Sequence, residues 1–447
     1  MSRILAVLSR VTRRPLTAIA ILAVLGAGAW AVTQPSLQLA ASCAGGGYGG
    51  TGYGGYGAPT GTCGPYVALA PRRVLDTRYG VGAPTGPVGA GQSITATITA
   101  SNGLPLTGAS AVVLNVTVTD PTQNSYLTVW PTGQGLPNAS NLNFTPGETV
   151  ANLVTVQLGP SATVSFYNQA GSVQVIADLE GYVSTTATGS AGLFNPLPGS
   201  RVLDTRTGLG GISSPVGAGQ VIRFPVAGAG GVPPTGVGAV VLNITATEPT
   251  TASDVTVFGD ATSRPPTSNL NFGAGQTIAN RVIVQVVNGY VDIYNSVGSV
   301  QMVADVNGYY TNSSTSSASG SDFNSEAPVR IADTRPGSGL PYAGQTIGPG
   351  GTLTINVAGT AGVPAMTSAS PPTAVVMNVT VTGTTAGSFL SVWPANFSRP
   401  LISDINWVPG QIQPNLVVVE LSPSGTVSFY NAAGSTDIVV DVEGWYS

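Results

Sequence analysis

The feature that most constrains this chain is an internal repetition, because one block of sequence occurs three times, about 128 residues apart. Each copy opens with an Arg-x-x-Asp-Thr-Arg motif, at residues 73–78, 201–206 and 330–335. Each closes with Tyr-Asn followed by Asp-x-x-Gly-Tyr or Asp-x-x-Gly-Trp. Solenoids and propeller blades repeat every 20 to 50 residues or so, whereas a unit of this length can bury a core of its own. The repetition therefore predicts three domain-sized copies of one fold.

Within each copy the apolar residues alternate with polar ones, which is the pattern of a half-buried β-strand. In 111–119 the residues Val112, Leu114, Val116 and Val118 share one face, and Asn115, Thr117 and Thr119 share the other. Further strands are expected at 92–100, 126–130, 140–144, 150–158, 163–168 and 173–178. The chain also has 60 Gly and 34 Pro, enough for a turn every eight to twelve residues or so. We expect an all-β protein of three tandem antiparallel β-sandwiches, of jelly-roll or immunoglobulin-like type.

The predicted repeats span 66–184, 191–311 and 322–447. The joints at 184–192 and 311–321 are rich in Ser, Thr, Gly and Ala and have no apolar period, which is typical of linkers. Such joints favour three separate domains on a string over one shared core, although linkers this short also permit neighbouring repeats to dock.

The N-terminal segment, residues 1–35, has the pattern of an export signal. A basic stretch ending in Arg13 and Arg14 precedes an apolar run at 15–32, and Ala29-Trp-Ala31 offers a small-x-small cleavage site. Cleavage after Ala31 gives a secreted protein, while an uncleaved run of about 18 residues is long enough to remain as a membrane anchor. Both alternatives place the repeats outside the cell, and only this segment would contact a membrane.

A Gly/Tyr-rich linker follows at 36–65 and contains the two cysteines of the chain, Cys43 and Cys63. Because it has no apolar period, this segment cannot build a core. In an oxidising exterior the two cysteines are expected to form a disulfide.

The composition also excludes several classes of function. The chain has no His, all fifteen of its basic residues are Arg, and only 8% of its residues are charged. It therefore lacks an imidazole base for a Ser or Cys nucleophile and the ligands of a Cys/His zinc site. It also lacks the basic surface that binding to nucleic acid requires. No cofactor or metal is expected.

The repeated charged motif is the most distinctive candidate site. Each copy places two Arg and one Asp in its opening motif and a further Asp near its end. The members are Arg73, Asp76, Arg78 and Asp178 in repeat 1, Arg201, Asp204, Arg206 and Asp305 in repeat 2, and Arg330, Asp333, Arg335 and Asp441 in repeat 3. We interpret them as a structural ion network, because a fold determinant must recur in every copy and a binding site need not. The alternatives are a calcium site, which Glu180, Asn307 and Glu443 could extend, and a glycosidase carboxylate pair.

Aromatic residues four positions apart suggest a second site, because residues four apart on a strand share a face. They are Tyr126 with Trp130 in repeat 1 and Phe389 with Trp393 in repeat 3; repeat 2 has Asp254 and Phe258. If exposed, these rings could stack against sugar rings. The alternative is that the face lies under a loop or against the next repeat.

One Asn-containing motif also recurs in every copy. Asn115, Asn243 and Asn378 fit the N-glycosylation pattern, but their position in mid-strand favours a cross-strand hydrogen-bonding role.

The order VLDTR, AVVLNVTVT, SYLTVWP, SNLNF, TVANLVTVQLG and YNQAGSVQVIADLEGY resembles a repeat of secreted and cell-envelope proteins of high-GC Gram-positive bacteria. The resemblance covers about 85% of the chain and implies accessory β domains with a role in surface attachment. The sequence as a whole thus predicts an exported, non-catalytic structural or adhesion protein of the cell surface. A secreted protein that binds cell-wall polysaccharide or another surface polymer is the alternative, followed by a His-free glycosidase.

Overall fold

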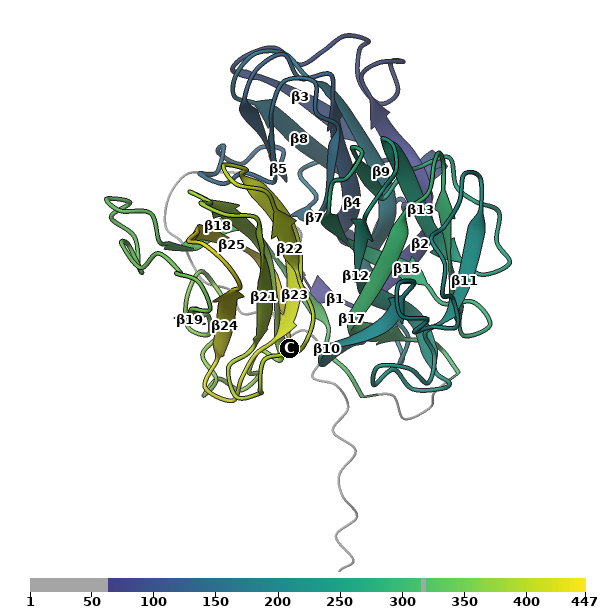
Figure 1. The fold of residues 1–447 in the computed structure, drawn as a ribbon. Helices are drawn as coiled ribbons and strands as arrows, with labels where there is room; N and C mark the ends of the chain where they lie inside the picture. The colour runs from purple at the N-terminus through teal and green to yellow at the C-terminus, as the bar shows by residue number, and fades with distance from the viewer. Residues whose placement is uncertain (1–62, 315–318) are drawn as a thin grey trace, which may run out of the picture. The chain divides into compact units, whose positions relative to one another are not determined.

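The computed structural model describes residues 63–314 and 319–447. In this part of the chain the elements are β-strands, apart from one short 3-10 helix, η1 (Ala100–Asn102) (Figure 1). The predicted all-β class is therefore confirmed. The predicted signal or anchor segment, Cys43 and most of the Gly/Tyr-rich linker lie outside the described residues.

Repeat 1 is a sandwich of two four-stranded antiparallel sheets. Its elements are β2 (Tyr66–Asp76), β3 (Gln92–Thr97), η1, β4 (Ala109–Thr119), β5 (Ser125–Pro131), β6 (Leu142–Phe144), β7 (Val150–Gln157), β8 (Thr163–Asn168) and β9 (Gln174–Ser184). One sheet, which we call the inner sheet, has the order β2-β9-β4-β7, and the other, the outer sheet, has the order β3-β8-β5-β6. The sequence anticipated each strand within a few residues, except β2, which it recognised only as a motif.

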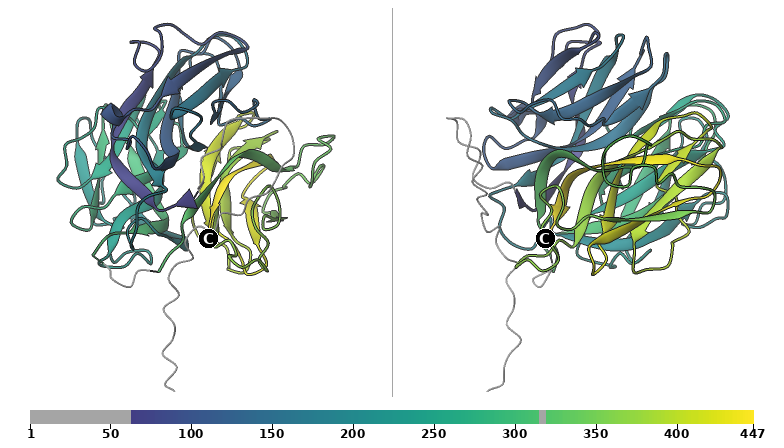
Figure 2. Two further views of the ribbon diagram at one scale, coloured as in Figure 1. Left: turned by 180° about the vertical axis from the view of Figure 1, so that it is seen from behind. Right: turned by 90° about the vertical axis from the view of Figure 1, so that its left-hand side faces the viewer.

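Repeats 2 and 3 have the same two sheets with the same strand order (Figure 2). Repeat 2 consists of β10 (Phe194–Asp204), β11 (Val221–Pro225), β12 (Val237–Thr247), β13 (Ser253–Gly259), β14 (Leu270–Phe272), β15 (Ile278–Gln285), β16 (Tyr290–Asn295) and β17 (Gln301–Thr311). Repeat 3 consists of β18 (Phe323–Asp333), β19 (Thr352–Asn356), β20 (Ala374–Thr382), β21 (Ser388–Pro394), β22 (Ile405–Trp407), β23 (Gln413–Glu420), β24 (Thr426–Asn431) and β25 (Asp437–Tyr446). A short strand that precedes repeat 1, β1 (Cys63–Gly64), pairs with β18.

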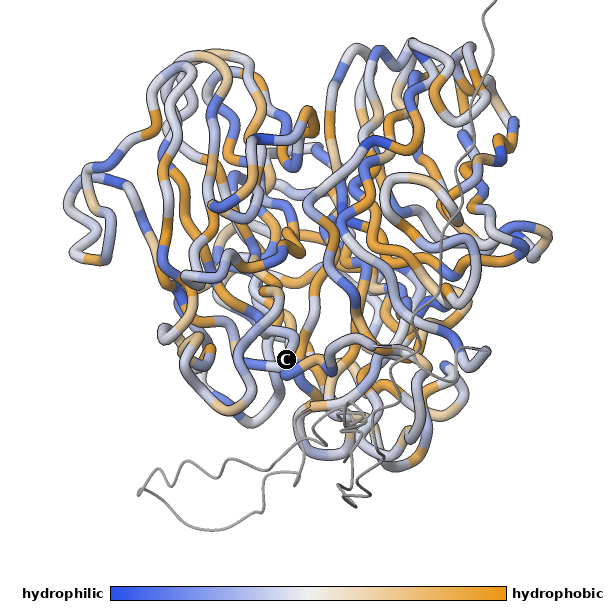
Figure 3. The backbone as a smooth tube through the Cα atoms, turned by 90° about the horizontal axis from the view of Figure 1, so that it is seen from below, coloured by the Kyte–Doolittle hydropathy of each residue, from blue (hydrophilic) through white to orange (hydrophobic). Residues whose placement is uncertain are grey.

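The core of each sandwich lies between its inner and outer sheets. The alternating apolar residues of β4, among them Val112, Leu114 and Val116, are fully buried there together with Phe166 of the outer sheet. Their counterparts in β12 and β20 are buried in the same way. The alternation is visible along the strands in Figure 3, where apolar and polar positions follow one another. The predicted inward faces are therefore confirmed.

The opposite face of each inner sheet is buried as well, which the sequence did not predict. Asn115 is 0% and Thr117 is 3% exposed, although both lie on the face expected to meet solvent. The prediction of half-buried strands is therefore wrong for the inner sheets. Their second faces pack against one another, so an inner sheet is covered on both sides.

The three inner sheets share a central core. It contains small and branched residues such as Val113 and Val241, and an aromatic group contributed by the first and last strands of the repeats. The aromatic group consists of Tyr66, Phe194, Tyr310, Phe323 and Tyr446. The rings of Phe194 and Tyr446 stack with centroids 4.1 Å apart, and the hydroxyl groups of Tyr310 and Tyr446 are hydrogen-bonded at 2.5 Å. Three separate domains on a string would leave this apolar surface in water, and that expectation is wrong.

The joints between repeats are also fixed by backbone hydrogen bonds. The Tyr66 N–H donates to the carbonyl of Gly192, and Phe194 and Ser321 exchange two backbone hydrogen bonds. Because β1 pairs with β18, the first described residues of the chain are joined to repeat 3. Repeat 1 thus contacts both of its neighbours.

The Gly of each closing motif has a packing role in this core. A Cβ atom on Gly308 would lie 2.4 Å from the ring of Phe194, and one on Gly181 would lie 2.3 Å from the hydroxyl of Tyr66. Only a residue without a side chain lets the aromatic ring of the first strand lie flat against the last strand. The recurrence of this Gly is explained by the close approach.

Candidate functional site

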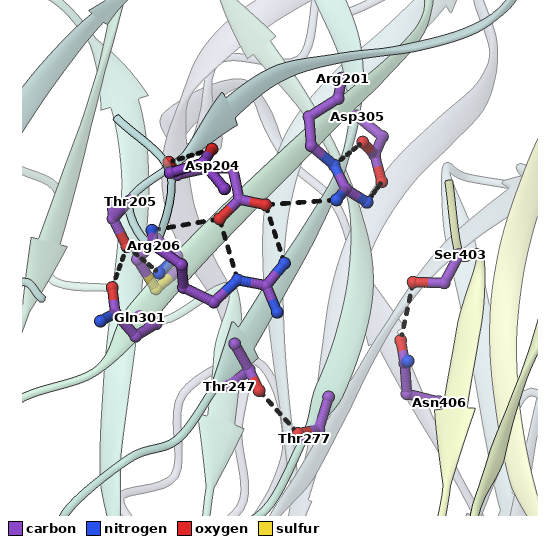
Figure 4. Close-up of polar contacts among 12 residues, drawn as sticks. Arg201, Asp204, Thr205, Arg206, Thr247, Thr277, Gln301, Asp305, Ser403 and Asn406 are labelled. Carbon is purple, nitrogen blue, oxygen red and sulfur yellow. Dashed lines mark hydrogen bonds and ion pairs between the residues drawn. The ribbon is translucent and has the colours of Figure 1, made fainter. Parts of the chain in front are cut away.

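The charged residues of the opening motif form a partly buried network with the Asp near the end of the repeat, shown for repeat 2 in Figure 4. Arg201 binds both carboxylate oxygens of Asp305, with its Nε 2.9 Å from Oδ1 and its Nη2 3.3 Å from Oδ2. Arg206 binds both oxygens of Asp204, at 2.9 and 2.8 Å. Arg201 also reaches Asp204 through Nη1 at 3.3 Å, which links the two pairs. Bidentate pairing of this kind fixes the geometry of both partners.

The same arrangement recurs in the other two repeats. In repeat 1, Arg73 binds Asp178 at 2.9 and 3.2 Å, and Arg78 binds Asp76 at 2.9 and 2.8 Å. In repeat 3 the corresponding pairs are Arg330 with Asp441 and Arg335 with Asp333. The bridging contact is the weakest there, because Arg330 Nη1 lies 3.9 Å from Asp333. The structure thus brings together all twelve residues that the sequence singled out.

Local geometry explains why the motif needs an Asp followed by Thr and Arg. Oδ1 of Asp204 accepts the backbone N–H of Arg206 at 3.1 Å, and Oγ1 of Thr205 accepts the N–H of Met302 at 2.9 Å. The Asp therefore holds the turn that follows the first strand, and the Thr ties that turn to the last strand (Figure 4). These contacts stabilise the fold, and they use both oxygens of the Asp204 carboxylate as hydrogen-bond acceptors.

The environment of the carboxylates argues against a glycosidase pair at this position. Asp76 is 0% and Asp178 is 1% exposed. Burial acts to raise the pKa of Asp76, but hydrogen bonds from Arg78 and the charges of Arg78 and Arg73 outweigh it and lower the pKa. Burial raises the pKa of Asp178, against the opposing effect of Arg73. A glycosidase pair requires two carboxyl groups that face an open cleft, and these two are closed off by guanidinium groups.

Three of the five residues predicted to form an aromatic sugar platform are buried. Trp130 is 8%, Phe258 5% and Trp393 6% exposed. The strand of Trp130 packs against β18, and the strand of Trp393 packs against β10. Phe258 borders a small cavity whose other wall includes Leu69 and Pro71 of repeat 1. The indole N–H groups of Trp130 and Trp393 donate to the loop carbonyls of Gln134 and Phe397. The rings are therefore buried under a loop and beside a neighbouring repeat, as the alternative interpretation had it.

The other members of the predicted platform remain half-buried on the outer sheets. The ring of Tyr126 lies 6.4 Å from that of Tyr167, and the ring of Phe389 lies 6.3 Å from that of Tyr430. The sequence missed Tyr167 and Tyr430 as partners because they belong to a different strand. Their recurrence in the Tyr-Asn pair of every repeat was the available signal.

A ring of asparagine contacts joins the inner sheets, and it passes through all three repeats in the same sense. Asn115, Asn243 and Asn378 each donate from Nδ2 to a backbone carbonyl of the next repeat, at 2.7, 2.7 and 2.6 Å. Each also accepts, through Oδ1, a hydrogen bond of 2.9 Å from Asn280, Asn415 or Asn152. The side chains of the mid-strand Asn residues therefore form hydrogen bonds as predicted, but the expectation of cross-strand partners is wrong, because the partners lie in a neighbouring repeat.

A buried Glu of the closing motif lies at two of the three interfaces between repeats. Glu443 accepts hydrogen bonds from Asn141 Nδ2 at 2.8 Å and from the Thr155 N–H at 3.1 Å. Glu180 accepts from Asn269 at 3.3 Å. Burial raises the pKa of Glu443 to about 8 and raises that of Glu180 well above its ordinary value. Glu443 therefore favours the protonated form at neutral pH.

The third interface, between repeats 2 and 3, contains a buried ion pair in place of the buried Glu. Asn307 stands where the other repeats have Glu, and Arg281 Nη2 lies 2.8 Å from Oδ1 of Asp404, with both side chains 0% exposed. Burial lowers the pKa of Arg281, against the opposing effect of Asp404. A guanidinium nevertheless stays protonated in proteins, so we take the pair as ionised.

Three further observations concern the described residues. No group of three or more His, Cys, Asp or Glu is placed to hold a metal ion in 63–314 and 319–447. In the same ranges no helix has the length and apolar character needed to cross a membrane. Cys63 is disulfide-bonded, and its predicted partner Cys43 lies outside these ranges.

Comparison with known proteins gives no family. No family model and no curated protein matches the sequence. Similar solved structures include one from the Sulfolobus turreted icosahedral virus, at 11% identity over 80% of this chain and 84% of that one, with a TM-score of 0.18. A second, described as a triple jelly roll in an archaeal virus, has 10% identity over 86% and 90% and a TM-score of 0.19. A third, the tandem CBM22 domains of Xyn10C from Paenibacillus barcinonensis, has 11% identity over 55% and 100% and a TM-score of 0.18. Likeness at this level supports no conclusion about function.

Proposed function

We propose that this chain is an exported, non-catalytic surface protein whose three sandwiches form one rigid body for structure or adhesion. One observation carries the proposal: the second faces of the three inner sheets pack against one another, through the central core and the asparagine ring. The surface that can contact other molecules is therefore formed by the outer sheets and the loops. A body of this kind presents surfaces in fixed positions, which lowers the entropy lost when it binds.

The distribution of charge supports the same proposal. The charged residues of the motifs are paired with one another in all three repeats. In repeat 1, Asp76 and Asp178 form ion pairs with Arg73 and Arg78. Ionised groups that hold strands in place are not free for acid–base chemistry. The predicted export segment would place this body outside the cell.

The test is to express the full chain with a C-terminal epitope in a high-GC Gram-positive host and to treat intact cells with a protease. We expect loss of the epitope from intact cells or its recovery in the medium, and stronger attachment of expressing cells to a coated surface than of cells without the gene. Retention in the cytoplasm would overturn the export part. Release of new reducing ends when the purified protein is incubated with polysaccharides would overturn the non-catalytic part.

Carbohydrate binding is a second candidate, and the half-buried aromatic pairs on the outer sheets favour it. Tyr126 with Tyr167 and Phe389 with Tyr430 keep half-buried rings on the outer sheets, although β5 and β21 also contact a neighbouring repeat. Aromatic faces of this kind pack against the C–H faces of sugars. Arg399 lies over the ring of Tyr430 at 3.9 Å and adds a planar hydrogen-bond donor beside it.

A pull-down on purified wall polysaccharide tests this candidate. We expect the Tyr126→Thr and Phe389→Thr double variant to be retained less than the unmodified protein. Tyr79→Thr is the matched control, because Tyr79 is 75% exposed on a loop outside the outer sheets. Equal retention of all three proteins would remove these aromatic pairs as a binding platform.

A further inference from the structure

The outer sheet of repeat 2 differs from its two copies at three neighbouring positions. Repeat 2 has Arg223, Asp260 and Asp292 where repeat 1 has Thr95, Thr132 and Ser165, and where repeat 3 has Thr354, Ala395 and Ser428. The strand register establishes the equivalence, because Arg223, Thr95 and Thr354 lie opposite Asp292, Ser165 and Ser428. The sandwich forms twice without these charges. They are therefore not required by the fold.

In repeats 1 and 3 the equivalent residues satisfy one another. The hydroxyl groups of Thr95 and Ser165 lie 3.3 Å apart, and those of Thr354 and Ser428 lie 2.9 Å apart. Thr132 adds a second hydroxyl contact to Ser165 at 2.8 Å. Small neutral pairs of this kind leave no strong donor or acceptor for a ligand.

In repeat 2 the charged residues leave one strong acceptor without a donor. Arg223 Nη2 lies 3.0 Å from Oδ2 of Asp260, which also accepts from Asn288 Nδ2 at 3.1 Å. Asp292 is 8% exposed, and its buried Oδ1 has no hydrogen-bond partner among the described residues. A buried carboxylate oxygen without a donor is costly, so such an atom calls for a ligand group to satisfy it.

The surroundings of Asp292 define what that ligand can be. Tyr290, Asp292 and Tyr294 share one face of β16, because they alternate along the strand. The guanidinium of Arg223 lies 3.9 Å from the ring centroid of Tyr290, and that of Arg264 lies 3.9 Å from the centroid of Tyr294. The row thus combines a carboxylate acceptor, two planar donors and two aromatic rings.

A divalent cation fits this row poorly, since Arg223 already neutralises Asp260 at 3.0 Å and cations of this class need six or more oxygen ligands. A sugar ring fits it well. Its hydroxyl groups donate to carboxylates and accept from guanidinium groups, while its C–H faces pack against aromatic rings. The side chain of Arg223 is 51% exposed, so its guanidinium can be reached by a ligand at the surface of the outer sheet.

We propose that Arg223, Asp260 and Asp292 form a binding site on repeat 2 for a hydroxyl-rich sugar residue of a glycan, flanked by Tyr290 and Tyr294. This site rests on the carbohydrate-binding candidate and supplies carboxylate acceptors beside the aromatic surface. It assigns recognition of the sugar to one repeat, whereas the other two add stacking surface.

The test uses the full chain on an array of neutral, amino-sugar and uronate oligosaccharides, with titration calorimetry on the best binder. The key variant is Arg223→Thr, Asp260→Thr and Asp292→Ser, which gives repeat 2 the residues of repeat 1. Because repeat 1 folds with those residues, we expect an unchanged melting temperature and at least a ten-fold loss of affinity. The matched control, Thr95→Ala with Ser165→Ala in repeat 1, should bind as the unmodified protein does.

The outcomes separate the site from the function. Undiminished binding by the triple variant would overturn the site and leave carbohydrate binding to the aromatic pairs. No binding of the unmodified protein to any glycan on the array would overturn both. Binding that requires added Ca²⁺ and is abolished by a chelator would identify a cation site instead. If the triple variant is less stable, the single variant Asp292→Asn tests the site instead, because it removes the charge and keeps the shape of the side chain. We expect it to lose at least five-fold in affinity.

Discussion

Replacement of Arg281 by Leu tests how the interface between repeats 2 and 3 is held together. Arg281 is fully buried, binds Asp404 at 2.8 Å, donates to the carbonyl of Leu416 at 3.1 Å and also contacts Asn307. The equivalent positions in repeats 1 and 3 are Leu153 and Leu416, so the new side chain has a precedent in the same surroundings.

The expected cost follows from the partner that is left behind. Without Arg281, Asp404 keeps a hydrogen bond of 2.7 Å from the Val392 N–H but has no opposite charge in a site that is 0% exposed. Removing one member of a buried ion pair destabilises by about 3–5 kcal/mol. For a cooperative unit of this size we expect the melting temperature to fall by about 5 °C.

The charge can also be removed from both sides. The double variant Arg281→Leu with Asp404→Asn places Leu and Asn where the other two interfaces have them. Adding Asn307→Glu completes the match to the interface of Glu443 with Asn141. Replacing a buried ion pair by neutral residues is often neutral or stabilising, so we expect both combined variants to regain most of the lost stability.

Urea unfolding followed by tryptophan fluorescence measures these four proteins and the single Asp404→Asn variant, which completes a double-mutant cycle and gives the coupling between Arg281 and Asp404. We expect a coupling free energy of about 3 kcal/mol. A single Arg281→Leu variant as stable as the unmodified protein, together with a coupling near zero, would refute the view that this pair is ionised and holds the interface.

Three further predictions follow from the same contacts. Because the pKa of Glu443 is raised from 4.5 to about 8, the native state holds its proton more tightly than the unfolded chain. The contribution of Glu443 to the free energy of unfolding is therefore greatest below about pH 4.5 and is lost, by up to about 5 kcal/mol, as the pH rises to about 8; Glu443→Gln should flatten this part of a pH series of urea titrations. Asp178→Asn should destabilise by about 3 kcal/mol because it leaves the half-buried Arg73 without its bidentate partner, and an unchanged urea midpoint would contradict a structural role for the network. Gly308→Ala should cost about 1–3 kcal/mol, measured by calorimetry, because the new Cβ would lie 2.4 Å from Phe194; a melting temperature equal to that of the unmodified protein would show that the ring moves freely.

The sequence by itself determined the number of repeats, the β class and the face of each strand that meets its own sandwich core. These follow from local rules, since alternation has a fixed period and turn residues end strands. It also identified the ion network, because three charges within six residues stand out in a chain that has few. For Val112 and Leu114, for example, the alternation alone predicted that the side chains lie in the core of their own sandwich.

Only the tertiary structure decided what covers the second face of the inner sheets. Asn115 and Thr117 look like solvent-facing residues in a strand, and Trp130 looks like an exposed ring, because a local pattern distinguishes two faces without saying what lies against each. The neighbouring repeat supplies that cover, and its contacts join residues more than a hundred positions apart. For the same reason the sequence alone does not explain why Arg281, Asn307 and Asp404 all depart from the repeat pattern. Arg281 pairs with Asp404 and contacts Asn307 at an interface between two repeats, so each change is accommodated by the others.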